Sequence, residues 1–318
     1  MNYLEFIGFL QIVLIATTPV VFAGIGELVT EKSGVLNLGV EGMMLVGAVT
    51  AFVTLVITGS YVLAFLFSIL AGIFMSGLFA FLVLILMSNQ VATGLSLTIF
   101  GIGLSSMIGK KYIGTPIDGL TPWYFVIFSF LIVFLVGYFF YKTKSGLILR
   151  AVGESHTSAH ALGYSVLKIR LLAILFGGSM CAFAGSYISI CYAPMWQEGM
   201  IAGRGWIALA LVVFSTWKPS RILIGAYIFG GTSIFQMHLQ GKGFRFPHWV
   251  PLDDFFSSAP FFNMSPYLAT MIVLVIISSN KLRIKLSAPA CLTMPFYKGS
   301  QNIHLFNSNL YLESLSLR

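Results

Sequence analysis

Asn37 and Glu41 are the residues whose type and spacing first suggest chemistry. They lie in a glycine-rich polar segment, residues 24–44, between two long apolar runs. Four residues apart on a helix, they would share one face. No charged residue follows Glu41 until Lys110, so we expect Glu41 at or inside a membrane boundary, where an ionisable group suggests a functional site. Glu41 either serves such a site or holds the turn by hydrogen bonds, and for Asn37 the structural alternative is favoured.

A second polar group is centred on Arg204. It stands between Gly203 and Gly205, directly before a short apolar run that ends near residue 217. Glycines on both sides of this cation predict a broken or re-entrant element near the outer face, because irregular backbone at membrane depth must line a cavity or be covered by protein. The alternative is an arginine that extends its head to the membrane interface.

The segment from Arg150 to Gly163 carries a third signal. Glu154 is followed by alanines and then by Gly163, which predicts a short helix that ends at a glycine. Such a helix on a loop could dock into a groove of a partner protein. His156 and His160 would share a face, but a metal site needs more ligands than the segment offers, so we expect no metal.

Catalysis has no visible support in the sequence. We find no Gly-x4-Gly-Lys-Ser/Thr loop for nucleotide phosphates, no nucleophile elbow and no zinc-protease helix. Asp253 and Asp254 are adjacent, which does not form an acid/base pair. We therefore expect neither an enzyme nor a cofactor on this chain, and without such a loop it would not itself bind ATP in that manner.

The elements that position these residues follow from composition. Of 318 residues, 58% are hydrophobic and 9% are charged, against about 25% charged in an average soluble domain. The chain is therefore predicted to be an all-α, polytopic transmembrane bundle of about nine spans (eight to ten), with broken or re-entrant segments near 24–44 and 199–217. The predicted spans lie near 5–23, 35–58, 61–87, 91–109, 123–141, 169–193, 205–217, 221–238 and 265–280.

Lysine and arginine set the predicted orientation. They concentrate in the loop 142–168 and after the last predicted span, so both regions and the C-terminus are expected in the cytoplasm. A membrane domain is predicted over 1–297, followed by a polar tail, residues 298–318. The net charge of +8 fits this loop asymmetry and is not taken as a sign of nucleic-acid binding. Small residues at four-residue spacing (Gly72, Ser76, Ala80; Gly101, Ser105, Gly109) predict close helix packing.

These segments, in this order, resemble the permeases of ATP-binding-cassette (ABC) importers of the branched-chain amino acid, ribose and nucleoside type, and most closely the simple-sugar/nucleoside branch. The pattern Ser-Gly-Val-x-Asn-x-Gly-x-Glu-Gly-Met-Met is met by residues 33–44. Arg-Ala-Val-Gly-Glu with a later Ala-Leu-Gly is met by 150–154 and 161–163, and Ala-Gly-Arg-Gly-x-Ile-Ala-Leu-Ala by 202–210. Asn89-Gln90-Val91-x-x-Gly94 and Pro295-Phe296 also fit the family.

The resemblance implies a multi-pass protein of the bacterial inner membrane that forms the path for a nucleoside, or for a simple sugar such as ribose or a branched-chain amino acid. An extracytoplasmic binding protein, a second and often non-identical permease subunit, and ABC ATPase subunits would be its partners, beside membrane lipid. The implied path or gate residues are Asn37, Glu41, Asn89, Gln90 and Arg204. The implied ATPase-coupling residues are Arg150, Gly153, Glu154, Ala161, Leu162 and Gly163.

Two other classes compete with this interpretation. A secondary transporter is also a bundle with broken helices, but it would usually carry more intramembrane ionisable residues, and Glu41 is expected to be nearly alone. A membrane-embedded enzyme would need a catalytic constellation. The sequence departs from the family at residues 155–158, Ser-His-Thr-Ser, which leaves open how tightly the loop holds its ATPase.

Overall fold

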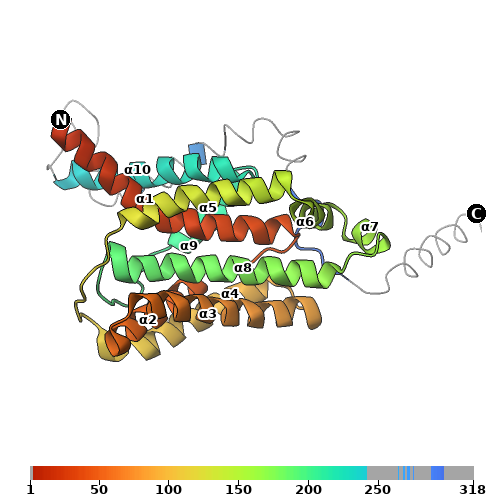
Figure 1. The fold of residues 1–318 in the computed structure, drawn as a ribbon, viewed down its shortest axis with the longest axis horizontal. Helices are drawn as coiled ribbons and strands as arrows, with labels where there is room; N and C mark the ends of the chain where they lie inside the picture. Colours follow the sequence, from red (N-terminus) through yellow and green to blue (C-terminus); the bar gives the residue numbers. More distant parts are fainter. Residues whose placement is uncertain are drawn as a thin grey trace, which may run out of the picture.

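The computed structural model describes residues 3–241 and 288–296, together with the isolated helical positions 264, 268, 271, 272 and 275. Within these residues the chain is helical without a β-strand, and the long helices run side by side (Figure 1). The elements are α1 (Tyr3–Lys32), α2 (Val40–Thr58), α3 (Tyr61–Ala80), η1 (Phe81–Ile85), α4 (Gln90–Gly109), η2 (Lys110–Tyr112), α5 (Trp123–Lys142), α6 (Lys144–Glu154), α7 (His156–Ala161), α8 (Val166–Tyr187), η3 (Ile188–Tyr192), α9 (Arg204–Phe214) and α10 (Pro219–Gly241).

Seven described helical stretches are long and apolar enough to cross a membrane. They are Glu5–Lys32, Val40–Thr58, Tyr61–Ile85, Gln90–Tyr112, Trp123–Lys142, Val166–Tyr192 and Pro219–Gly241. The predicted all-α polytopic bundle is thereby confirmed. The predicted span at 205–217 is the short helix α9, and the one at 265–280 lies largely outside the described residues.

Helix α1 extends further than the sequence suggested. Its predicted end at residue 23 is wrong, because the helix continues to Lys32. Glu27 and Glu31 are four residues apart and both are buried, so they occupy one inward face and do not interrupt the helix. The irregular segment is therefore residues 33–39, within which Gly34 has a φ of +90° that favours glycine.

Helix α8 lies at the centre of the bundle and packs against α1, α2 and α3. A side chain at Gly185 of α8 would collide with the backbone oxygen of Met44 in α2, and one at Gly47 of α2 would collide with Ala182 of α8. Backbones can approach this closely only where side chains are absent, and such contact supports helix association in lipid.

The two predicted stripes of small residues lie on helix interfaces, as expected. A Cβ at Gly101 of α4 would lie 2.6 Å from the Cα of Gly42 in α2. A Cβ at Gly72 of α3 would collide with the backbone oxygen of Gly178 in α8. The spacing of small residues therefore predicted the packing faces of α3 and α4 correctly.

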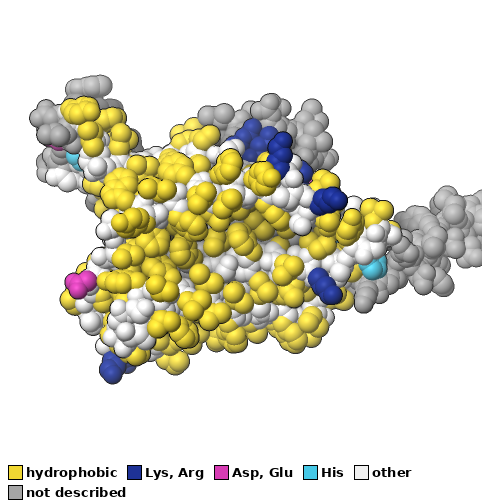
Figure 2. Space-filling model, viewed as in Figure 1, with side chains coloured by type: hydrophobic (Ala, Val, Ile, Leu, Met, Phe, Trp, Pro, Cys, Tyr) yellow, Lys and Arg dark blue, Asp and Glu magenta, His cyan; other side chains and the backbone are white. Residues whose placement is uncertain are grey.

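The outside of the bundle is apolar along its length. Figure 2 shows hydrophobic side chains over most of the visible face, with lysine and arginine gathered toward one end. Ile99, Ile127 and Phe134 are each at least 67% exposed, a surface suited to lipid. We call the end that carries Lys142, Lys144, Arg150, Lys168, Lys218 and Arg221 the basic end.

Candidate functional site

The loop between α1 and α2, residues 33–39, is held by buried side chains of neighbouring helices. The Oε1 atom of Gln90 accepts a hydrogen bond from the N–H of Leu36 at 2.9 Å, and Oε1 of Glu27 accepts one from the N–H of Asn37 at 2.9 Å. Irregular backbone inside a membrane protein needs such partners, because water is not there to supply them. Glu27 and Gln90 therefore stabilise the break in the chain.

Asn37 closes this loop. Its Oδ1 accepts a hydrogen bond from the N–H of Gly39 at 2.9 Å, and its Nδ2 lies 3.5 Å from the sulfur of Met43. The side chain is fully buried. A side-chain oxygen bonded two residues ahead forms an Asx turn, here directly before α2. The geometry supports the structural role that was favoured for Asn37.

Glu41 joins this loop region to the start of α9. Its Oε1 accepts a hydrogen bond from the N–H of Gly203 at 2.8 Å, and its Oε2 accepts one from the N–H of Gly205 at 2.7 Å. The first N–H groups of a helix have no partner within the helix, and the helix dipole favours an anion there. Glu41 is therefore a carboxylate cap for a helix that begins 163 residues later.

Helix α9 reaches only part-way across the bundle. Its eleven residues span about 16 Å, roughly half of a hydrocarbon core of about 30 Å. At the far end of α9, the indole N–H of Trp217 donates a hydrogen bond to Oε2 of Glu31 at 2.6 Å, close to the basic end. The first turn of α9 and the carboxylate of Glu41 therefore lie about half the thickness of a hydrocarbon core away from the basic end.

A cavity of about 310 Å³ opens beside the first turn of α9, between α1, α9 and α10. Its lining is mixed, with apolar side chains around a few polar ones. The polar side chains are Thr17, Tyr192, Arg204, Ser233 and Gln236. This mixture is typical of a site that binds a small polar solute.

Arg204 is the charged residue of this cavity and is held on two sides. Its guanidinium lies 5.2 Å from the ring centroid of Tyr192, within the range of a cation–π contact. Its Nη1 donates to the backbone oxygens of Met200 and Ile201, both at 3.1 Å. The side chain is only partly buried, so it is anchored at the wall and still reaches the cavity.

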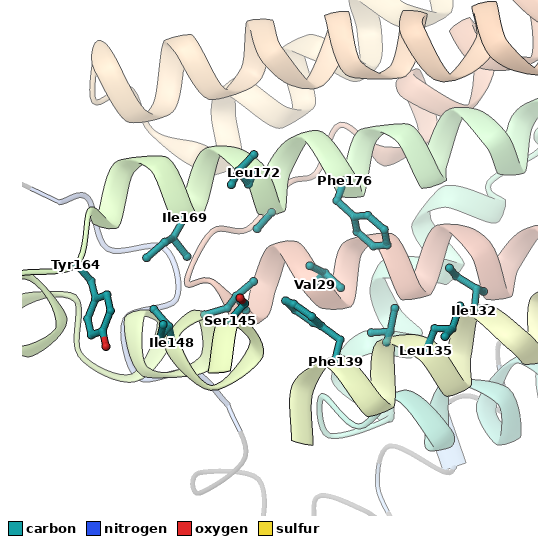
Figure 3. A pocket seen from close by; sticks show the side chains of 13 residues that line it. Val29, Ile132, Leu135, Phe139, Ser145, Ile148, Tyr164, Ile169, Leu172 and Phe176 are labelled. Carbon is teal, nitrogen blue, oxygen red and sulfur yellow. The ribbon is translucent and has the colours of Figure 1, made fainter. Parts of the chain in front are cut away.

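A larger cavity of about 610 Å³ lies between α1, α5, α6 and α8. Val29, Phe139 and Phe176 are among the side chains that point into it (Figure 3). Its described lining is aliphatic and aromatic except for Ser145 and Tyr164. This lining offers few hydrogen bonds to a polar solute, so the smaller cavity at Arg204 is the better candidate.

Helices α6 and α7 form a separate element at the basic end (Figure 1). Glu154 ends α6 and is exposed, and Ala161 ends α7. Leu162 follows with 77% of its surface exposed, and Gly163 has a φ of +86°. The predicted short helix that ends at Gly163 is thus confirmed, and the exposed apolar side chain of Leu162 directly follows it.

The segment 288–296 packs under these two helices. The N–H of Cys291 donates to the backbone oxygen of Gly153 at 2.9 Å. The ring of Phe296 lies 5.5 Å from that of His156 and 5.3 Å from that of His160, edge to face. Both histidines therefore contact this aromatic ring. Burial and the nearby Arg170 lower the pKa of His156.

Arg170 ties the same segment to the loop 33–39. Its Nε donates to the backbone oxygen of Ser33 at 3.1 Å, and its Nη1 donates to that of Met294 at 3.0 Å. The side chain is fully buried. A continuous set of contacts therefore runs from α6 and α7, through 288–296 and Arg170, to the end of α1.

Residues 9–277 match the family model described as "Branched-chain amino acid transport system / permease component". The chain belongs to this family. The resemblance read from residues 33–44, 150–163 and 202–210 is confirmed, and the chain is a multi-pass membrane protein of an ABC transporter permease family.

Several characterised or named proteins are similar to this permease along most of its length. It is 35% identical to the "Putative glucose ABC transporter permease protein TsgC13" of Haloferax volcanii, over 91% of this chain and 97% of that protein. It is 25% identical to the guanosine ABC transporter permease NupQ of Bacillus subtilis, over 91% and 96%. It is 28% identical to the nucleoside ABC transporter permease NupC of Lactococcus lactis, over 83% and 90%. No solved structure matches the chain.

The structure brings four of the five predicted path residues into two neighbouring places. Glu41 and Arg204 meet at the first turn of α9, whereas Asn37 and Gln90 hold the loop before α2. Asn89 lies apart from them: it is exposed, and its Oδ1 caps α4 by accepting the N–H of Ala92 at 3.0 Å.

Sequence reasoning missed four buried polar residues of this permease. The expectation that Glu41 would be nearly alone is wrong, because Glu27 and Glu31 are also buried within α1. The contacts of Trp217 with Glu31 and of Arg170 with the backbone of Ser33 were also not foreseen. The spacing of Glu27 and Glu31 was an available signal, since two acids four residues apart share a helix face.

Proposed function

We propose that this permease forms one side of the path through which an ABC importer carries a nucleoside or a simple sugar. The observation that carries the proposal is the cavity at Arg204, at the start of a half-helix, which we place about half-way through the membrane. Substrate sites near the bilayer midplane beside the N-terminus of a broken helix are typical of transporters. The names of the relatives, which include glucose, guanosine and nucleoside permeases, support the same solute classes.

The chemistry of the cavity favours a neutral, hydroxylated solute. Hydroxyl groups of Thr17 and Ser233 and the guanidinium of Arg204 can hydrogen-bond to sugar hydroxyls, and the ring of Tyr192 can stack on a base or pack against a sugar face. No carboxylate is among the described lining residues, so the ammonium group of an amino acid would lack an ionic partner. We therefore rank branched-chain amino acids last.

The two ends of the molecule indicate where its partner proteins would bind. We assign the basic end to the cytoplasm, because lysine and arginine concentrate on that side of membrane proteins. The ATPase subunits would then bind α6 and α7, with Glu154 and Leu162 at the contact. A second permease subunit, which need not be identical, would complete the path, and a binding protein would deliver solute at the opposite end.

Uptake of labelled inosine by cells with and without this gene tests the proposed solute class. The cells keep their native partner subunits, and each assay is repeated with excess unlabelled ribose, glucose or leucine. We expect energy-dependent inosine uptake to be lost on deletion and to resist leucine. If inosine uptake persists while ribose or glucose uptake disappears, the solute is a sugar. Loss of leucine uptake alone would contradict the proposed solute class.

A further inference from the structure

A third cavity, separate from the one at Arg204, lies at the basic end and has a strongly cationic lining. It measures about 440 Å³ and is formed where α1, α5, α6 and the turn between α9 and α10 meet. Three cationic side chains, Lys32, Arg150 and Lys218, line it together with one carboxylate, that of Glu154. Lys32 interacts electrostatically with the other three groups and with Glu31 of α1, so three cationic residues face two acidic ones. The excess of positive charge favours binding of an anion in this cavity.

Two features of the Arg150 side chain favour binding of an anion. Its guanidinium lies 5.2 Å from the ring centroid of Tyr141, which orients its plane. Its Nε is buried and has no hydrogen-bond partner within the described part of the chain. A buried donor without an acceptor is unfavourable, and a phosphate oxygen is an acceptor that arginine binds well. Arg221 adds positive charge nearby, where it contacts Thr216 of the same cavity wall.

A groove of about 610 Å³, mainly apolar but with Lys142 and Ser220 in its lining, adjoins this cavity. It runs between α5 and α10, and Tyr141 lines both the cavity and the groove. Along α5 the groove extends from Phe130 to Tyr141, a rise of about 16 Å. That distance is about the depth of one leaflet of a bilayer whose hydrocarbon core is about 30 Å thick. Phe134 and Tyr138 are more than half exposed along it, so the groove is accessible from the lipid.

We propose that this permease binds one phospholipid with an anionic headgroup at this place. The phosphate lies in the basic cavity, where Arg150 and Lys218 contact it, and an acyl chain follows the groove between α5 and α10 toward the middle of the bilayer. Basic pockets at the ends of membrane helices bind anionic headgroups in this way. A free phosphate ion would satisfy the cavity alone, whereas only a lipid satisfies the cavity and the groove together.

The bound lipid would add a further bridge between elements that already contact one another, as Trp217 and Glu31 do. Its headgroup would contact the end of α1, helix α6 and the turn before α10, and therefore lie directly behind the element that we assign to the ATPase. The lipid site itself does not depend on which solute the permease carries. Loss of the lipid is expected to loosen α6 from the bundle.

The test is a lipid titration of the purified full-length chain in detergent, followed by native mass spectrometry. The probes are a short-chain phosphatidylglycerol, the matching phosphatidylcholine and inorganic phosphate. We expect one phosphatidylglycerol to bind in clear preference to phosphatidylcholine. The double variant Arg150→Gln/Lys218→Gln should weaken it by roughly 30-fold, as expected for two cations near a lipid surface. The control Lys110→Gln/Lys111→Gln, two exposed lysines at the opposite end, should bind as the wild type does.

A second variant separates a lipid from a free anion. Gly137→Trp places a bulky side chain in the groove, at a position where an added Cβ meets no atom within 4 Å, and should abolish phosphatidylglycerol binding while the basic cavity stays intact. Equal binding of both lipids, or equal weakening by the control, would overturn the proposal. Binding of inorganic phosphate that competes fully with lipid and is unaffected by Gly137→Trp, with lipid binding also unaffected, would show an anion site and overturn the lipid assignment.

Discussion

The carboxylate of Glu41 and the backbone N–H of Gly205 are 2.7 Å apart, although 163 residues of chain separate the two positions. This hydrogen bond, with its neighbour from Gly203, joins the two polar segments of the sequence into one structure. An acidic residue buried in a membrane protein is costly unless it is paired, and here the start of a helix supplies the pairing. The position of α9, and of Arg204 in its first turn, therefore depends on Glu41.

Removing the carboxylate of Glu41 should destabilise the permease. Glu41→Ala leaves two N–H groups without an acceptor, and hydrogen bonds to charged groups contribute about 1.5–3 kcal/mol each. Glu41→Gln keeps one acceptor oxygen and should be intermediate. Thermal denaturation of the full chain in detergent measures the effect, with Glu198→Ala as an exposed control. Equal melting temperatures of Glu41→Ala and the wild type would contradict a capping role.

Gly205 should tolerate no side chain. A Cβ at this position would lie 2.6 Å from the Cα of Glu41, and because that neighbour is backbone, α9 itself must move. We expect Gly205→Ala to lose most transport activity and to melt at a lower temperature. Gly103→Ala is the matched control, since a Cβ in the middle of α4 at that position meets no atom within 4 Å. Normal transport by Gly205→Ala would show that α9 is not held against α2.

Arg204 should affect solute passage more than folding. We expect Arg204→Gln to lower the maximal uptake rate about tenfold, the effect of losing one charged hydrogen bond worth about 1.5 kcal/mol. The half-saturating concentration should change little if the binding protein sets it. ATP hydrolysed per solute molecule should rise. Arg204→Lys should be intermediate, because lysine keeps the charge but not the planar contact with Tyr192. An unchanged uptake rate would place Arg204 outside the path.

The contact between Trp217 and Glu31 should contribute to stability as a pair. Trp217→Phe removes the indole N–H and leaves a buried carboxylate oxygen without its donor, which costs about 1.5–3 kcal/mol. Glu31→Gln in the same protein should recover part of the loss. A double-mutant cycle on thermal stability measures this coupling. Strictly additive effects of the two substitutions would indicate that the 2.6 Å contact contributes nothing.

Glu154 is expected to affect binding of the ATPase subunits and to leave the stability of the fold unchanged. We expect Glu154→Arg to abolish solute uptake and reduce co-purification of the ATPase subunits, with unchanged thermal stability, because the residue is exposed at the end of α6. Glu198→Arg makes the same charge change at an exposed position outside α6 and α7 and should leave co-purification intact. Normal uptake by Glu154→Arg would mean that the coupling assignment is wrong.

The sequence predicted the architecture because lipid imposes simple rules. Apolar runs mark spans, small residues such as Gly101 mark interfaces, and glycine ends short helices, as at Gly163. The end of α1 was missed because Glu27 and Glu31 resemble loop residues when tertiary partners are unknown. Only the fold brings the Asn37 N–H to Glu27 and the Trp217 indole to Glu31.

The sequence predicted the separate polar segments of the candidate site but not the contacts between them. The polar segments around Glu41 and Arg204 stand out against apolar flanks, so both were found from the sequence. Their contact could not be found, because neither residue type nor spacing encodes a pairing across 163 positions. Residue Asn89 shows the opposite case: it lies beside Gln90 in the sequence, yet its exposed side chain only caps α4.

Reconstitution in proteoliposomes tests the central claim most directly. The permease is inserted with its ATPase subunits and any second permease subunit, the binding protein is added with labelled solute on one side, and accumulation is followed with and without ATP. We predict accumulation that requires both ATP and the binding protein and that Glu154→Arg abolishes. Accumulation driven by an ion gradient without ATP would contradict this account and identify the protein as a secondary transporter.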